Sequence, residues 1–104
     1  MLKLWQERLG LKLHHKEYII TFKNTNFAIK AEQCLLEKMH VGVLPLPSQI
    51  SAGCGICLRV KQDEINAALA ALAEREIAAA GLYSRTVENG QYLYEKLPIM
   101  FTNG

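Results

Sequence analysis

The sequence lacks the features that mark several large classes of protein. No apolar run approaches the ~18 residues that a membrane-spanning helix needs, and the N-terminal segment is interrupted by charges, unlike a secretory signal. We therefore expect a cytoplasmic protein with no membrane partner. Lys and Arg residues are scattered along the chain instead of gathering with aromatic residues, which predicts no nucleic-acid partner either.

Cysteine is scarce, and the chain has three of them, an odd number. With no export signal expected, a disulfide framework is not predicted, and the thiols should be reduced. Cys34 falls on the apolar side of a helical pattern, where a free cysteine usually packs as core. A structural zinc site needs four ligands. One Cys-x-x-Cys pair with dispersed histidines does not supply them, so we predict no metal.

What the sequence does contain is enough apolar material for one core. Of 104 residues, 50% are hydrophobic and 21% are charged, as in ordinary globular domains. Asn24-Thr25-Asn26 supplies N-cap residues ahead of a helical pattern over 27–39. Gln62-Asp63-Glu64 opens a second helical pattern, which Gly81 is expected to end in a left-handed cap. Strands are predicted over 18–23, 41–46, 56–60, 82–87 and 91–95.

The order of these elements predicts the architecture. Asn89-Gly90 between the last two β-like segments indicates a two-residue hairpin. The sequence therefore predicts an α+β, ferredoxin-like β-α-β-β-α-β antiparallel sheet with two helices on one face and a C-terminal hairpin. Residues 18–104 form this single domain, and residues 1–17 form an N-terminal extension whose leucines fit both a strand and a helix.

Two cysteines stand three residues apart in Cys54-Gly55-Ile56-Cys57, and this spacing allows more than one chemistry. Reactive pairs of this type usually begin a helix, but here the pair leads into a predicted strand. Extended backbone would place the two Cα atoms roughly 10 Å apart with the side chains on opposite faces. That separation exceeds the reach of a disulfide, about 7 Å. A turn through Gly55 would bring the two cysteines within reach of each other and make Cys57 a resolving thiol.

Cys54 is the better candidate for a single reactive thiol. Gly53 and Gly55 flank it and are expected to leave its sulfur uncovered. In the predicted topology the first helix starts, at Thr25-Asn26, beside the loop that carries Cys54. Free N–H groups and the helix dipole there favour a thiolate, the nucleophilic form. The sequence fits equally well a loop over Ser51–Gly55 that is only a tight connection.

Three short motifs occur in a characteristic order: Ala31-Glu32, Pro45-Leu46-Pro47, and the loop Ile50-Ser51-Ala52-Gly53-Cys54-Gly55. With the segments around them, from Tyr18 to Tyr94, they resemble the selenium/sulfur carrier protein-like family of small bacterial domains. The resemblance implies that Cys54 holds sulfur or selenium as a persulfide or selenopersulfide. It also implies a carrier or sulfurtransferase-like intermediate more than a stand-alone enzyme.

The resemblance implies partners but no metal or bound cofactor. The partners would be sulfur or selenium donor and acceptor proteins, such as a cysteine desulfurase. Two other functions stay open: a noncatalytic ferredoxin-like binding or regulatory module, and a thiol redox protein that uses Cys54 with Cys57. The supporting residues in the loop and at the helix start would be Gly53, Gly55, Ser51, Thr25 and Asn26.

Overall fold

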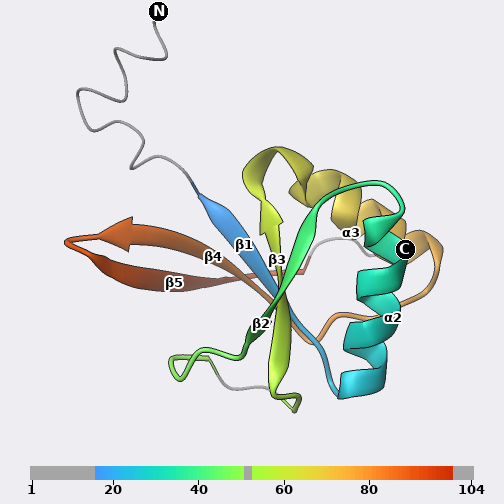
Figure 1. Ribbon diagram of the computed structural model, residues 1–104, viewed down its shortest axis with the longest axis horizontal. Helices are drawn as coiled ribbons and strands as arrows, with labels where there is room; N and C mark the ends of the chain where they lie inside the picture. Colours follow the sequence, from blue (N-terminus) through green and yellow to red (C-terminus); the bar gives the residue numbers. More distant parts are fainter. Residues whose placement is uncertain (1–15, 51–52, 100–104) are drawn as a thin grey trace, which may run out of the picture.

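The computed structural model describes residues 16–50 and 53–99. They form a five-stranded antiparallel sheet with two helices, which confirms the predicted α+β class (Figure 1). No helix in these two ranges is long and apolar enough to cross a membrane. The elements are β1 (Glu17–Thr21), α2 (Thr25–Leu36), β2 (Val41–Pro45), β3 (Ile56–Lys61), the 3₁₀ turn η2 (Gln62–Glu64), α3 (Ile65–Glu74), β4 (Gly81–Glu88) and β5 (Gln91–Leu97).

The strands lie in the order β2-β3-β1-β4-β5, and every neighbouring pair is antiparallel. The first six predicted elements are present in their predicted sequence order. The seventh, β5, pairs along β4 and makes a fifth, outer strand, so the sheet is wider than a simple four-stranded one. Asn89 and Gly90 both have positive φ, 54° and 78°, as the predicted two-residue hairpin requires.

The two faces of the sheet differ in what covers them. Buried residues of α2 and α3 share one core with sheet residues such as Ile20 and Leu58. Both helices therefore cover the same face, as predicted. On the other face, which we call the open face, a second cluster contains Ile19, Cys57 and Ile50, with partly buried neighbours from strands and loop and none from a helix. Because side chains alternate along a strand, Ile19 and Ile20 belong to different faces.

Helix α2 begins two residues earlier than predicted. The Asn24 side-chain oxygen accepts a hydrogen bond from the Phe27 N–H at 3.0 Å, so Asn24 is the N-cap. The helix also ends earlier, at Leu36 instead of residue 39. Its buried residues are Ala28, Ala31, Cys34 and Leu35, whose spacing of three and four marks one face.

The predicted end of the second helix is wrong. Helix α3 ends at Glu74, and Gly81 is the buried first residue of β4. The Glu76 N–H donates to the Ala73 carbonyl and the Ile77 N–H donates to the Leu72 carbonyl. With Glu76 at a φ of 59°, this is a left-handed helix cap built on a glutamate. The sequence pattern pointed to the nearest glycine, five residues too late.

The left-handed backbone at Glu76 makes a stability prediction. Glycine adopts this conformation without the clash that costs other residues about 1 to 2 kcal/mol. We therefore expect Glu76→Gly to raise the free energy of unfolding by roughly 1 kcal/mol in urea denaturation. The control is Glu74→Gly in the last turn of the helix, which should lower it by up to about 1 kcal/mol. A destabilised Glu76→Gly variant would show that this glutamate does more than cap the helix.

Candidate functional site

Cys54 lies where the β2–β3 loop meets the start of the first helix. Its Sγ atom is 3.6 Å from the Oγ1 atom of Thr25, the first residue of α2. Its side chain belongs to the core beneath the helices. The structure thus brings together the candidate thiol and the helix start, although they lie 29 positions apart in the sequence.

The loop reaches this place by passing very close to the β1–α2 connection. A Cβ atom built at Gly53 would lie 2.5 Å from the backbone oxygen of Lys23, a separation that real side chains do not show. Gly55 differs, since a Cβ atom there would have nothing within 4 Å. Glycine is therefore required by close packing at position 53, whereas the surroundings of Gly55 leave room for a side chain.

The expectation that the glycines leave the Cys54 sulfur uncovered is wrong. The exposed fraction of Cys54 is 5%, close to the 4% of Cys34 and above the 0% of Cys57. Gly53 and Gly55 are themselves exposed, but the Cys54 side chain between them turns inward to the core. Glycine neighbours leave the backbone exposed, but they do not determine which way the side chain between them points.

Cys57 lies on the opposite face of the sheet from Cys54. It packs with Ile19 and Ile50 on the open face, and its Sγ atom is 3.9 Å from the Pro45 carbonyl oxygen. All three cysteines are free thiols. Burial raises the pKa of Cys57 to about 11; the positive charge of Arg85 partly offsets this increase, and Cys54 adds to it. At neutral pH Cys57 is therefore a protonated thiol, which is a poor nucleophile.

Two further residues, Asn26 and Ser51, are predicted to support the Cys54 site. Asn26 is an exposed residue of the first turn of α2, and Ser51 lies outside the described residues. Sequence reasoning did not identify Lys23, whose carbonyl oxygen lies against Gly53. No sequence signal could have found it, because the contact is made by a backbone atom.

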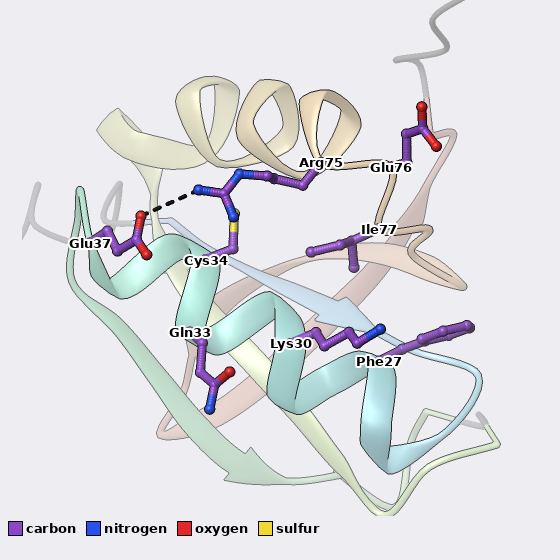
Figure 2. Close-up of a pocket in the computed structure, with 8 residues that line it drawn as sticks. All are labelled: Phe27, Lys30, Gln33, Cys34, Glu37, Arg75, Glu76 and Ile77. Carbon is purple, nitrogen blue, oxygen red and sulfur yellow. Dashed lines mark hydrogen bonds and ion pairs between the residues drawn. The ribbon is translucent and has the colours of Figure 1, made fainter.

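Cys34 lines a hollow of about 370 Å³ between α2 and the end of α3 (Figure 2). The Arg75 side chain reaches across toward Glu37, with a guanidinium nitrogen 3.4 Å from the carboxylate. The Cys34 thiol donates to the Ala71 carbonyl oxygen at 3.9 Å. Cys34 is thus a core residue held between the helices, and Cys54 does not line this hollow.

The comparison with known families identifies the family of this chain. The family model described as "Putative Se/S carrier protein-like" matches residues 17–84, from the start of β1 into β4. The chain belongs to this family. The matched region contains α2, the β2–β3 loop and all three cysteines, whereas β5 lies beyond it. Comparison with curated proteins and with solved structures gave no match. Among residues 16–50 and 53–99, no three His, Cys, Asp or Glu side chains are grouped as metal ligands would be.

The tight packing at Gly53 predicts unequal effects of two matched substitutions. Gly53→Ala must push the loop away from the Lys23 carbonyl, and we expect it to lower the free energy of unfolding by about 1 to 3 kcal/mol. It should also change the rate at which iodoacetamide alkylates Cys54. Gly55→Ala is the control, and its stability should stay within about 0.5 kcal/mol of wild type. Equal effects of the two substitutions would contradict the close approach.

The raised pKa of Cys57 predicts a loss of stability at high pH. The folded state favours the neutral thiol of Cys57. The stability that this preference contributes is fully present below pH 9 and is lost as the pH rises through about 11. In urea denaturation from pH 8 to 11, wild type should lose up to about 2 kcal/mol more than Cys57→Ala. Parallel pH dependences of the two proteins would show that Cys57 titrates as an ordinary thiol.

Proposed function

We propose that the chain is a selenium/sulfur carrier in which the Cys54 sulfur takes up a sulfur or selenium atom and passes it on. The observation that supports this most directly is the contact between Cys54 and Thr25 at the start of α2, inside the region that matches the family. The fold of this carrier would be the ferredoxin-like plan, with β5 added at the edge of the sheet beside β4.

The transfer needs only nucleophilic displacements. The Cys54 thiolate attacks the outer sulfur of a donor persulfide, and the donor's S–S bond breaks. The donor leaves as a thiolate with the bonding electron pair, and Cys54 now carries the persulfide. An acceptor nucleophile then attacks the outer sulfur and releases the Cys54 thiolate. The outer atom moves in the same oxidation state, so the carrier needs no external oxidant or reductant.

The helix start provides the stabilisation that this chemistry uses. The Thr25 hydroxyl can donate to the Cys54 sulfur, since either atom of the pair can be the donor. The first N–H groups of a helix have no partner within it, and the helix dipole is positive at this end. Both favour negative charge on sulfur, in the free thiolate and in the terminal atom of a persulfide.

The burial of Cys54 gives the carrier protection at the expense of speed. Only 5% of Cys54 is exposed, so its sulfur is shielded from small thiols that would remove the outer atom of the persulfide. Donor and acceptor must then contact the loop closely enough to open its packing. We propose that these partners are proteins, with a cysteine desulfurase as a candidate donor, in the cytoplasm where thiols stay reduced.

A resolving role for Cys57 is less well supported than the single-thiol carrier. Cys54 and Cys57 pack on opposite faces of the sheet, and burial raises the pKa of Cys57 to about 11. Both observations weigh against an intramolecular disulfide and hence against a two-thiol redox protein. A noncatalytic binding module would need neither thiol, so sulfur loading distinguishes it from the carrier.

Loading by a cysteine desulfurase that carries a persulfide tests the assignment of Cys54. Intact-mass spectrometry should show one added sulfur atom on wild type and on Cys57→Ser, and none on Cys54→Ser. Circular dichroism should show that all three proteins are folded. Loading of Cys54→Ser at the wild-type rate would overturn the proposal, and loading of none of the three would favour the binding module.

Thr25 should act through its hydroxyl group. We expect Thr25→Val, which keeps the shape of the side chain, to slow the loading of Cys54 about tenfold through loss of a hydrogen bond to a charged atom. Thr25→Ser retains the hydroxyl and should load within about threefold of wild type. Slowing by Ser as large as that by Val would show that packing of the methyl group, not the hydroxyl, matters.

A further inference from the structure

The open face of the sheet gathers charges and rings that are scattered in the sequence. Residues paired directly across antiparallel strands share a face. From Ile19 the pairing leads to Arg59 on β3 and to Tyr83 on β4. Carried across all five strands, it assigns four cations, three tyrosines and one carboxylate to this face: Arg59, Lys61, Arg85 and Lys96; Tyr83, Tyr92 and Tyr94; and Glu17.

The positive charge of this face exceeds that of the whole protein. Four cations and one carboxylate leave an excess of three positive charges, against +2 for the full chain. Glu17 partly neutralises two of the cations, since it lies 3.7 Å from the Arg59 Nε atom and accepts a hydrogen bond from the Arg85 Nε atom at 3.1 Å. Lys61 and Lys96 are exposed. Among the described residues neither lysine forms an ion pair, so exposed positive charge lies on both sides of the Glu17 network.

The same network presents an aromatic ring. The buried Arg85 guanidinium lies 4.0 Å from the centre of the Tyr92 ring, and the Tyr92 and Tyr94 rings are 6.3 Å apart. Tyr92 is nevertheless 49% exposed. Arg85, which Glu17 holds in place, therefore packs against one side of the Tyr92 ring, and about half of Tyr92 is exposed to solvent.

A hollow of about 1000 Å³ adjoins this ring. Its lining includes the cations Lys61 and Arg85 and the Tyr92 ring, together with the carboxylates of Glu17 and Asp63. It lies at the end of β3 that carries Lys61, whereas Cys54 precedes the opposite end, at Ile56. At about 3.3 Å per residue the two ends of the strand are some 16 Å apart, so a ligand here would leave the thiol free.

We propose that the open face binds single-stranded nucleic acid, with a base stacked on Tyr92 and phosphates near Lys61 and Lys96. Stacking platforms combined with cations along a groove are how proteins hold single strands without reading their sequence. An acidic protein segment would pair with the cations, but its binding would not need the exposed Tyr92 ring. This differs from the expectation drawn from the sequence, where the cations do not cluster.

The proposal stands apart from the carrier chemistry, because Tyr92 and Lys96 lie beyond residues 17–84, which match the family. Fluorescence anisotropy with a labelled single-stranded oligouridine of about 12 nucleotides tests it at low and moderate salt. Inorganic polyphosphate, which has charge but no bases, is the second probe. We expect the oligouridine to bind and polyphosphate to bind at least tenfold more weakly.

Variants separate stacking from charge. Tyr92→Ala should weaken oligouridine binding about tenfold, and Tyr92→Phe should restore most of it. Lys61→Gln should weaken binding and lower the slope of log affinity against log salt by about one. Lys30→Gln makes the same charge change at an exposed position of α2, on the other face, and should have no effect.

Three results would overturn the proposal: no binding of oligouridine to the folded protein at low salt, equal binding of polyphosphate with no effect of Tyr92→Ala, or equal losses from Lys61→Gln and Lys30→Gln. The second of these results would instead assign the face to polyanions or acidic proteins. A persulfide-bearing cysteine desulfurase should load Tyr92→Ala as fast as wild type, which keeps this test independent of Cys54.

Discussion

The close approach of Gly53 to the backbone oxygen of Lys23 is the constraint on which the site depends. A Cβ atom would lie 2.5 Å from that oxygen, so the β2–β3 loop can lie against the β1–α2 connection only without a side chain there. The next residue is then held at the start of α2, where the Cys54 sulfur lies 3.6 Å from the Thr25 hydroxyl oxygen. One backbone contact thereby joins the candidate nucleophile to the one end of the helix that stabilises negative charge.

The alternation of side chains along β3 divides the rest of the molecule. Cys57 and Arg59 face away from the helices, whereas Leu58 packs beneath them, and Cys54 joins the same core as Leu58. Two thiols that look like a pair in the sequence are therefore in separate clusters. Both are buried, but Cys54 lies beside a helix start, whereas Cys57 packs on the open face and its pKa rises to about 11. The same alternation collects the cations and tyrosines of the open face.

Patterns of local sequence predicted the elements well where one residue type controls the outcome. Asn89-Gly90 predicted the hairpin, and the cap region around Asn24 predicted the start of α2 to within two residues. Prediction failed where tertiary contacts decide: Glu76 occupies the left-handed cap expected at Gly81, and Cys54 turns inward between exposed glycines. The cationic open face was missed because it exists only once strand register is known.

We propose that Cys54, and neither of the other thiols, carries the transferred atom. The most direct measurement maps the added sulfur in unmodified protein: loading with a persulfide donor, trapping with an alkylating reagent, and fragment-mass analysis of each cysteine-containing peptide. We expect the trapped persulfide on the peptide that contains Cys54, joined to the Cys54 sulfur itself. A persulfide found mainly on Cys57 or Cys34 would contradict it.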